Sequence, residues 1–544
     1  MRTTIFTGVS LIALAMAAPA LAQSVSTVDQ TGAGNAATVS QTDANSSDID
    51  QIGTDNIAGV QQTGGSGNTS DIDQNSIGAL ADVRQTGTDN SSTINQIDGS
   101  SFSSTGAVPQ DPEAFVVQNG TNNESTVNQS AEAPSYNLVA NVNQTNEDNV
   151  SDIQQDIVDN AIAGSQRALV TQAGSSDSLV MQSSSNNGAR NLGASVNQAD
   201  SVSTVLQSAS GANAVGLDAR VRQRNGSDSI IEQTATGNGS GDLFANVRQD
   251  NGAISRVTQT ANGEQSVTQD AIVVQNGAST SNITQTFEND GSTTFLATVT
   301  QNGDGNLSNV TQRDQGFGVI GNADGFLTAT VSQTGDDNTS DLVQENKSQL
   351  ASITQSGDGN ISDAFQTTAG NDFTLEQSGD LNISNLSQTY LNNAADVLQA
   401  GVGATSTINQ SGRNDLAFVD QLVGSDGSSS IINQTGAGLV RSENSATVTQ
   451  SGADNMSLIE QDGFNSTAEL TQSGAGNTST ITQTGTVDGL GNAAEVTQSG
   501  SGNMSDILQN GSLNSATVTQ SSDNNISNIQ QLGNSGTITV TQGL

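Results

Sequence analysis

A glutamine recurs about every eleven residues along the chain, and this period constrains the fold more than any other feature of the sequence. Near the C-terminus, Gln498, Gln509, Gln520, Gln531 and Gln542 are each eleven residues apart. A short fixed period indicates one structural unit copied many times. We therefore predict a stacked array of repeats rather than a single globular core.

The residues before each glutamine alternate as the two faces of a β-strand do. In the segment that ends at Gln520, one face carries Asn514, Ala516 and Val518, and the other carries only serine and threonine. The first face holds the only aliphatic residue, so we expect it to point inward. The next segment has Ser and Ile in place of Ala and Val, and the two types alternate from the first repeats onward. We expect each type to stack on its own kind and form its own sheet.

Turn residues separate the strands, as in the Gly-Asp-Gly-Asn segments at 303–306 and 357–360. Glycine supplies the positive φ of a tight reversal, and asparagine tolerates it. We predict an all-β fold, a flattened two-sheet β-solenoid (a cross-β stack) of about 21 two-strand coils with about 22 residues per coil. The longer spacings follow the Ser-type strands, mainly in residues 97–333, so we expect insertions to project from one edge.

Residues 1–22 have the organisation of a secretory signal peptide. Arg2 supplies a positive charge, residues 5–18 are apolar, and residues 20–22 fit the small-residue pattern of a cleavage site. We expect residues 23–544 to form a single repeat array. No later segment has the ~20 apolar residues of a membrane helix, so we expect no membrane insertion.

The composition argues against most enzyme classes and several kinds of partner. The chain has no His, Cys or Trp, and 55 acidic against 13 basic residues give a formal charge of −42. Without His and Cys, the common general base, the thiol nucleophile and most transition-metal ligands are missing. We therefore expect no enzyme, no cofactor and no metal site. Nucleic acids and anionic membranes need a basic footprint, so we expect neither as a partner.

The first repeat has a defined pattern of polar and small residues, Ser24-x5-Gln30-x-Gly32-x-Gly34-Asn35-x-Ala37-x3-Gln41. This pattern is similar to the repeat of curlins, the secreted subunits of bacterial curli fibres, and partial matches cover nearly all of residues 23–544. The resemblance implies a cross-β coil and polymerisation outside the cell into amyloid fibres. It also implies an outer-membrane export channel and a nucleator subunit as partners. The chain departs from the family in its much greater length and its irregular insertions.

Stacked coils place Gln over Gln and Asn over Asn, so that side-chain amides can form hydrogen bonds along the stack. A buried amide without its neighbour costs about 1–3 kcal/mol, and adding a second molecule at the end avoids this loss. We therefore predict that the chain assembles with itself. The predicted inward ladder consists of Asn35, Gln41, Asn56, Gln62, Asn477, Gln483, Asn492, Gln498, Asn503, Gln509, Asn514, Gln520, Asn525, Gln531 and Gln542.

Acidic residues occupy outward positions on many Ser-type strands. Stacked carboxylates repel each other, so these residues can act as gatekeepers that keep the chain soluble during export. A plain solvated surface explains them equally well. The residues are Asp48, Asp71, Asp152, Asp341, Asp363 and Asp506.

We predict a secreted structural protein of curli-like amyloid fibres that serves biofilm matrix, adhesion and cell aggregation. The main alternative is a monomeric or surface-attached β-solenoid adhesin that has the same fold and does not polymerise. An ice-binding solenoid needs a continuous outward threonine array, which Asn141 and Arg220 interrupt. A carbohydrate-cleaving β-helix needs clustered carboxylates, whereas the acidic residues here are scattered. Weak calcium binding by the Gly-Asp-Gly-Asn turns stays open.

Overall fold

The computed structural model describes most of the chain. The described residues are 23–98, 112–131, 137–158, 165–185, 190–210, 215–237, 241–263, 267–288, 293–314, 325–436, 442–485 and 490–543. The expected signal peptide and most of the expected edge insertions lie outside them.

The chain divides into two compact units. Unit 1 comprises Met1–Ala271 and Phe287–Gly291, and unit 2 comprises Ile272–Thr286 and Ser292–Leu544. The single uninterrupted array stays a prediction.

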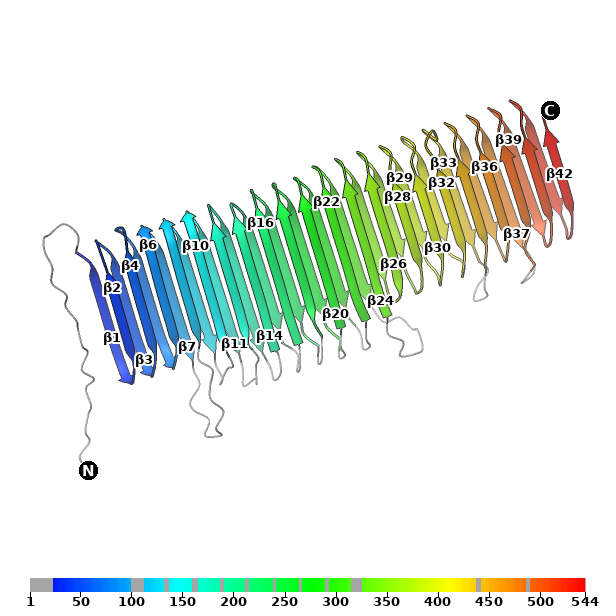
Figure 1. The fold of residues 1–544 in the computed structure, drawn as a ribbon. Coiled ribbons are helices and arrows are strands. Elements are labelled where there is room, and N and C mark those ends of the chain that lie inside the picture. Colours follow the sequence, from blue (N-terminus) through cyan, green and yellow to red (C-terminus); the bar gives the residue numbers. More distant parts are fainter. Residues whose placement is uncertain are drawn as a thin grey trace, which may run out of the picture. The chain divides into compact units, whose positions relative to one another are not determined.

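The described residues contain 42 β-strands, and within each unit successive strands alternate between two sheets (Figure 1). The odd-numbered strands of unit 1 are β1 (Val25–Ala33), β3 (Ser46–Thr54), β5 (Thr69–Ile77), β7 (Ser91–Asp98), β9 (Glu124–Ala131), β11 (Val150–Val158), β13 (Asp177–Ser185), β15 (Val202–Ala209), β17 (Asp228–Ala235) and β19 (Ile254–Ala261). Its even-numbered strands are β2 (Ala36–Gln41), β4 (Ile57–Thr63), β6 (Leu80–Thr88), β8 (Glu113–Thr121), β10 (Leu138–Glu147), β12 (Gln166–Ala173), β14 (Arg190–Ala199), β16 (Val215–Arg224) and β18 (Leu243–Asp250).

The division between the units falls within β20 (Val267–Asn276). The following odd-numbered strands are β21 (Thr280–Phe287), β23 (Leu307–Asp314), β25 (Thr339–Glu345), β27 (Ile361–Gln366), β29 (Ile383–Gln388), β31 (Thr405–Gln410), β33 (Ser429–Thr435), β35 (Met456–Asp462), β37 (Thr478–Gly485), β39 (Met504–Gly511) and β41 (Ile526–Leu532). The even-numbered strands of unit 2 are β22 (Thr293–Asn302), β24 (Gly325–Thr334), β26 (Gln349–Ser356), β28 (Asp372–Gln377), β30 (Ala394–Gln399), β32 (Leu416–Gln421), β34 (Ser445–Gln450), β36 (Thr467–Gln472), β38 (Ala493–Gln498), β40 (Ser515–Gln520) and β42 (Thr537–Gln542).

Within the described ranges, strands pair in parallel with the strand one coil later, up to β41 and β42, and the register places like residues on like residues. Between β3 and β5, Ile49 aligns with Ile72 and Gln51 aligns with Gln74. Between β40 and β42, Val518 aligns with Val540. Parallel in-register stacking at ~4.8 Å is the geometry of a cross-β structure. The predicted fold class, an all-β two-sheet solenoid, is confirmed.

The coils differ in length. Stacked glutamines are 22 residues apart from Gln355 to Gln377. They are 26 residues apart from Gln207 to Gln233 and 33 apart from Gln85 to Gln118. The predicted coil length of about 22 residues therefore holds for the shorter coils and is too small for the others.

Buried side chains alternate with exposed ones along most strands of both sheets, so the core is a row of side chains between the two sheets. The two strands of a coil run in opposite directions (Figure 1). Most odd-numbered strands place Ile, Val or Leu in this row, and most even-numbered strands place Ala and Val. In one coil, the small and the large buried residue change places between the two strands. Phe373 of β28 stands in the alanine position, while Ala364 of β27 stands in the large aliphatic position, and both are buried. The exchange keeps the core volume nearly constant, which close packing requires.

Several coils of unit 1 have longer strands and an additional apolar row. β16 has ten residues, whereas β28 has six. The extra length brings leucines of the even-numbered strands into one buried cluster with alanines of the odd-numbered strands. The cluster consists of Leu192, Leu217, Leu243, Ala209, Ala235 and Ala261. Part of the inserted sequence therefore extends the strands and the core, which the expectation of projecting insertions did not foresee.

Candidate functional site: amide ladders and stack edges

The ladder glutamines form hydrogen-bonded rows along each sheet. The Nε2 of Gln498 donates to Oε1 of Gln520 at 2.8 Å, and Nε2 of Gln520 donates to Oε1 of Gln542 at 2.7 Å. In unit 1, Nε2 of Gln41 donates to Oε1 of Gln62 at 2.6 Å. Each donor points to the next coil in the chain, so the ladder has a direction. The odd-numbered sheet carries the corresponding row of Gln483, Gln509 and Gln531.

The second hydrogen of each ladder amide links the two sheets. Nε2 of Gln509 on β39 also donates to the backbone oxygen of Ala493 on β38 at 2.9 Å. Nε2 of Gln520 on β40 donates to the backbone oxygen of Met504 on β39 at 3.0 Å. A buried amide group is costly unless it is hydrogen-bonded. The glutamines meet this requirement and hold the sheets together at the same time.

The ladder asparagines act mainly through their side-chain oxygens, which accept backbone N–H groups of the next coil. The N–H of Asn503 donates to Oδ1 of Asn477, and the N–H of Asn525 donates to Oδ1 of Asn503, both at 2.8 Å. The same bond joins Asn56 to Asn35 at 3.1 Å and Asn514 to Asn492 at 3.1 Å. The asparagines thus fix the turn of one coil on the turn of the next.

One carboxylate stands in an asparagine column of unit 2. The N–H of Asp415 donates to Oδ1 of Asn393 at 3.0 Å, and Oδ1 of Asp415 accepts the N–H of Asn444 at 2.9 Å. The side chain is 0% exposed. Burial raises the pKa of Asp415, although hydrogen bonds from Ser442 and from the backbone of Asn444 and Gly412 act in the opposite direction. The sequence prediction did not single out this residue.

Outward acidic residues stack on one another at the start of unit 1. Asp48 of β3 aligns with Asp71 of β5, and Asp50 aligns with Asp73. Desolvation raises the pKa of Asp71, and the charges of Asp73, Asp48 and Asp50 raise it further. The pKa of Asp50 is raised for the same reasons, with desolvation first. These carboxylates therefore oppose one another's ionisation in the folded coil.

The remaining outward acidic residues that we singled out differ in their surroundings. Asp341 aligns with Asp363, and desolvation followed by the charge of Asp363 raises the pKa of Asp341. Asp152 aligns with a threonine and a leucine, and Asp506 aligns with a threonine and an asparagine. Stacking of carboxylates on aligned strands therefore applies to four of the six residues.

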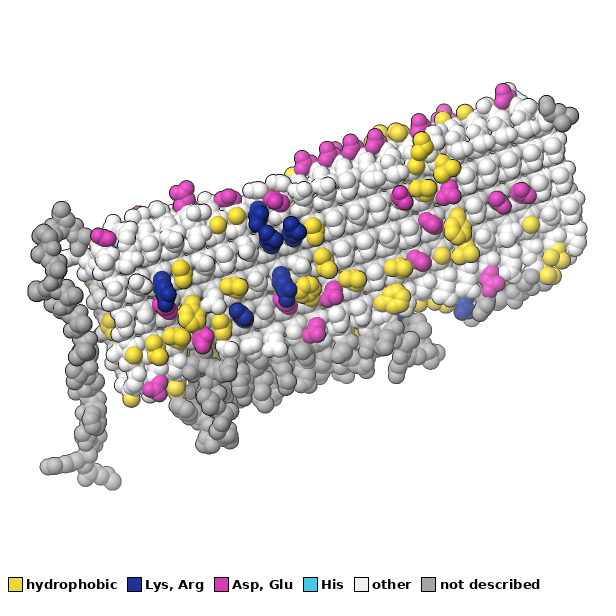
Figure 2. Space-filling view, viewed as in Figure 1, with side chains coloured by type: hydrophobic (Ala, Val, Ile, Leu, Met, Phe, Trp, Pro, Cys, Tyr) yellow, Lys and Arg dark blue, Asp and Glu magenta, His cyan; other side chains and the backbone are white. Residues whose placement is uncertain are grey.

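A further acidic row lies at the turns of unit 2. The N–H of Asp304 donates to Oδ1 of Asp336, that of Asp336 donates to Oδ1 of Asp358, and that of Asp358 donates to Oδ1 of Asp380, each at 2.9 Å. Figure 2 shows acidic side chains in a row along one edge. Turns that begin with Gly-Asp, including the two Gly-Asp-Gly-Asn segments, thus use the carboxylate to join neighbouring coils. Turn propensity alone does not reveal this role.

The first and last described coils present open strand edges. Among the described residues, β1 and β2 pair with other strands on one side only, as do β41 and β42. Gln41 and Gln542 are half-buried, whereas ladder glutamines inside the stack, such as Gln498, are buried. Unpaired edges are templates for the addition of further strands.

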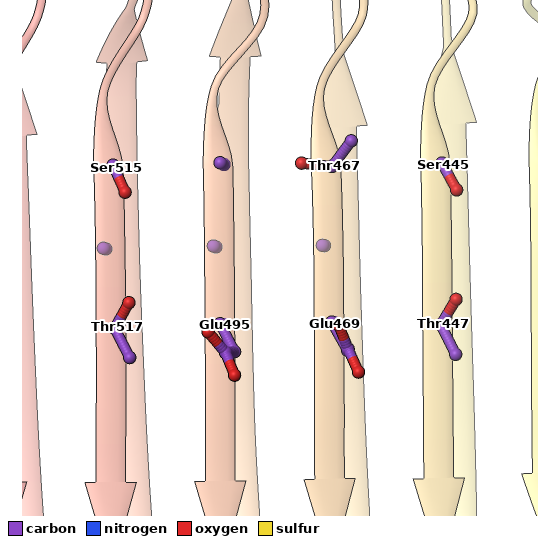
Figure 3. A pocket seen from close by; sticks show the side chains of 11 residues that line it. Ser445, Thr447, Thr467, Glu469, Glu495, Ser515 and Thr517 are labelled. Carbon is purple, nitrogen blue, oxygen red and sulfur yellow. The ribbon is translucent and has the colours of Figure 1, made fainter.

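The outer face of the even-numbered sheet in unit 2 has a shallow hollow of about 280 Å³ over β34, β36, β38 and β40. Its lining consists of serines, threonines, alanines, Glu469 and Glu495. Figure 3 shows the two glutamates at equivalent places on neighbouring strands, where they align in register. The lining includes no basic side chain to orient a substrate beside these carboxylates. The hollow therefore gives no reason to propose catalysis.

The described residues hold no candidate for a metal site or a membrane-spanning helix. No three His, Cys, Asp or Glu side chains come together in this part of the chain as the ligands of a metal ion would. No helix in the described ranges is long and apolar enough to cross a membrane.

Comparison with known protein families supports the resemblance seen in the first repeat. A family model described as the Curlin associated repeat matches residues 350–379 and 489–521. A search of curated proteins finds no match. The second matched segment includes β38, β39 and β40, which carry the Gln498, Gln509 and Gln520 positions of the ladders. The chain is therefore a two-sheet β-solenoid that contains Curlin associated repeats at these two places.

Proposed function

We propose that this protein assembles end to end into extracellular, curli-like amyloid fibres that contribute to biofilm matrix, adhesion and cell aggregation. The observation that carries the proposal is the direction of the glutamine ladders. Gln542 can donate its Nε2 hydrogen to a further coil, and Gln41 offers an Oε1 acceptor at the opposite edge. A second copy placed with β1 and β2 against β41 and β42 continues both ladders.

The columns at the two edges match in residue type. On the odd-numbered sheet, the inward residues of β1 correspond to those of β41, and on the even-numbered sheet those of β2 correspond to those of β42. Continuing the internal register across the junction aligns Ser26 with Ser527, Val28 with Ile529, Gln30 with Gln531, Ala37 with Ile538, Val39 with Val540 and Gln41 with Gln542. The junction then repeats the contacts within one molecule, so each added copy offers the same pair of strand edges to the next.

The family resemblance supplies the cellular part of the proposal. A chain with a secretory signal at residues 1–22 is exported. By analogy with curlins, export proceeds through an outer-membrane channel, and a nucleator subunit starts the fibre. The alternative is a solenoid adhesin with the same coils that does not grow. The open edges of β1, β2, β41 and β42 favour the fibre.

The stacked outward carboxylates fit a role as gatekeepers of assembly. The pKa values of Asp50, Asp71 and Asp341 are raised, so protonation favours the folded coil. Acid or added Ca²⁺ should therefore speed fibre formation. Replacing both Asp48 and Asp71 with Asn should remove part of this acceleration. Equal rates at about pH 7 and about pH 4 without Ca²⁺ would rule out the gatekeeper role.

The main experiment follows growth of the chain from Gln23 onward after dilution from denaturant. We expect a lag in thioflavin fluorescence, removal of the lag by seeds, and fibre reflections near ~4.7 and ~10 Å. A soluble β-rich monomer that does not grow on seeds would contradict fibre formation and favour the adhesin.

A substitution in β42 tests the role of that edge. The N–H of Ser515, which aligns with Thr537, donates to the backbone oxygen of Gly536 in the next coil at 2.7 Å. The N–H of Thr537 is in the same position to bond a second copy. Thr537→Pro removes this donor at the start of an edge strand, where proline is tolerated. We expect slower seeded growth than for Thr537→Ala, with the same circular dichroism. Equal growth of both variants would exclude this edge from assembly.

A further inference from the structure

Unit 1 carries an exposed group of arginines, which we call the basic patch. It consists of Arg222 and Arg224 on β16 and Arg248 on β18, and Arg222 aligns with Arg248. Figure 2 shows Lys and Arg side chains gathered in one part of the face drawn. Ion pairs within the described residues join Arg84 to Asp82, Arg220 to Asp218 and Arg256 to Glu232, and they involve no arginine of the patch.

The acidic groups near the basic patch have other partners. Asp218 pairs with Arg220 at 2.8 Å, and the guanidinium of Arg220 lies 5.2 Å from the centre of the Phe244 ring. Asp250 accepts hydrogen bonds from Nδ2 of Asn225 at 2.6 Å and from the N–H of Asn251 at 3.0 Å. Like charges on directly aligned strands destabilise a sheet. The chain has a net charge of −42, yet arginines of the basic patch stack on one another without an acidic partner in an ion pair among the described residues. This arrangement indicates that acidic groups of another molecule bind over them.

The opposite sheet of the same unit carries the complementary surface, which we call the acidic face. It consists of Asp48 and Asp50 on β3 and Asp71 and Asp73 on β5, aligned as two columns of carboxylates. Asp48, Asp50, Asp71 and Asp73 are all exposed. These columns repel each other as the arginines do, and they gain from a cation placed over them.

The two surfaces have the same spacing. Arg222 and Arg224 are two residues apart on one strand, as Asp48 and Asp50 are, which corresponds to about 6.6 Å. Arg222 and Arg248 are one coil apart, as Asp48 and Asp71 are, which corresponds to about 4.8 Å. Both sets project from the outer face of an in-register parallel sheet. The arginines of one sheet face therefore have the spacing that places them over the carboxylates of the other.

We propose that the basic patch binds the acidic face of a second copy of this chain, so that solenoids associate side by side. The contact joins different surfaces of the two partners, so each molecule keeps one surface of each kind free for further copies. This association goes beyond end-to-end growth and does not require it, because both surfaces lie within unit 1.

The test compares charge-reversed chains by electron microscopy and mass photometry at about 20 mM and about 500 mM salt. Particle width reports side-by-side association, and particle length reports end-to-end growth independently. The variants are Arg222→Glu with Arg248→Glu, and Asp48→Lys with Asp71→Lys. Arg167→Glu, an exposed arginine of β12 outside the patch, is the matched control.

We expect wild-type particles to pair side by side at low salt and to separate at high salt. Each double reversal should weaken this pairing about tenfold or more, whereas Arg167→Glu leaves it unchanged. Mixing the two double variants should restore pairing between them, since the reversed surfaces complement each other. This rescue separates charge recognition from a defect in folding.

Two outcomes overturn the proposal. One is wild-type pairing at low salt that neither double reversal changes. The other is wild-type particles that stay single while a polyuronate binds them through Arg222 and Arg248, because the partner of the patch is then an acidic polysaccharide. Loss of fibre length with normal pairing would count against end-to-end assembly and leave the side-by-side contact intact.

Discussion

The wide coils of unit 1 and the narrow coils of unit 2 place different residues at one equivalent position of the even-numbered strands. In the wide coils of β14, β16 and β18, this position holds Leu192, Leu217 and Leu243. In the narrow coils it holds Asn371, Asn393 and Asp415, directly before β28, β30 and β32. A buried apolar row in one region is thus replaced by a column of amides in the other.

The length of the preceding strand explains the difference. In a wide coil the odd-numbered strand continues past its ladder glutamine to an alanine, such as Ala209 or Ala235, and the leucine packs in the same cluster. In a narrow coil the strand ends at the glutamine and the chain turns at once. The asparagine then accepts a backbone N–H of the next coil, as Asn371 does from Asn393 at 2.9 Å. The turn between the two strands of a coil is therefore stabilised either by buried apolar side chains or by hydrogen bonds to the next coil.

The largest loss of stability should come from replacing Phe373, the large residue that stands in an alanine position of a narrow coil. Phe373→Ala leaves a cavity beside Ala364, and we expect a loss of about 3–5 kcal/mol in the local stability of β27 to β29. Stability is measured by hydrogen exchange of peptides from these strands, because repeat arrays open locally. Adding Ala364→Leu should restore most of the protection, and Thr374→Ala on the outer face is the control. If the second change does not restore protection, the two positions do not share one core volume.

Removing the apolar row should weaken the wide coils. Leu217→Ala deletes a buried side chain between its neighbours on β14 and β18, at an expected cost of about 2–5 kcal/mol. Hydrogen exchange should increase in peptides from β14 to β19 and stay unchanged in those from β27 to β32. Ser195→Ala, on the outer face of β14, is the matched control. Equal exchange in Leu217→Ala and the control would mean that the leucine row adds little.

Removing the side-chain amide of one ladder glutamine tests how much the ladder hydrogen bonds stabilise a narrow coil. Gln377 accepts from Gln355 at 2.8 Å, donates to Gln399 at 2.7 Å and also donates to the Ile361 backbone oxygen at 3.1 Å. Gln377→Leu keeps the volume and leaves these groups without a partner, at an expected cost of about 2 kcal/mol. Faster hydrogen exchange should appear on both sides of β28, and Glu376→Gln, on its outer face, is the control. No change in exchange would argue that the ladder adds no stability.

The carboxylate in the amide column makes one narrow coil sensitive to pH. Burial raises the pKa of Asp415 in the folded chain, so this group lowers stability once it is ionised. Stability of β30 to β34 should be highest below the pKa of an ordinary aspartate and should fall as the pH rises through that of Asp415. Asp415→Asn should abolish this local fall and increase protection at neutral pH. The check is hydrogen exchange at several pH values, corrected for the intrinsic rate. A pH profile that Asp415→Asn does not alter would contradict the assignment.

The smallest effect concerns the serine column of the odd-numbered strands. Within the described part of the chain, the buried Oγ atoms of Ser362, Ser384 and Ser406 have no hydrogen-bond partner. Ser384→Ala removes an unsatisfied hydroxyl and should stabilise its coil by about 1 kcal/mol. Slower exchange in β27 to β31 is the expected result. A loss of protection would mean that the hydroxyl makes a bond through water.

Period and face alternation allowed the fold class to be predicted. The eleven-residue spacing of Gln498, Gln509 and Gln520 gives the combined length of one strand and its turn, and the alternation of Ala and Val with Ser and Ile assigns strands to two sheets. Shifting the pairing of two strands by one residue would move the inward residues to the outer face. The alternation therefore allows only one register between stacked strands. The same pattern places the glutamines on the inner face, where the structure joins them in rows.

Other parts of the site were not predictable in this way. The leucines at 192, 217 and 243 each stand two residues before the alanine of their strand, a signal that is visible in the sequence. The eleven-residue period predicts the surrounding residues to be insertions, because the period alone does not separate a longer loop from a longer strand. Asp415 and the Asp304 to Asp380 turn row gain their roles only from neighbours one coil away.

The sequence by itself determined the repeat, the inward face and the residues that stack, because each follows from local alternation copied at a short period. The tertiary structure decided the width of each coil, the direction of the amide ladders and the stacked positions in which Phe373 and Ala364 exchange large and small residues. It also set the charges that lie side by side, such as Arg222 with Arg248. The physical reason is that these features depend on groups brought together by coils 21 to 33 residues apart in the chain, whose side chains meet only when the sheets form.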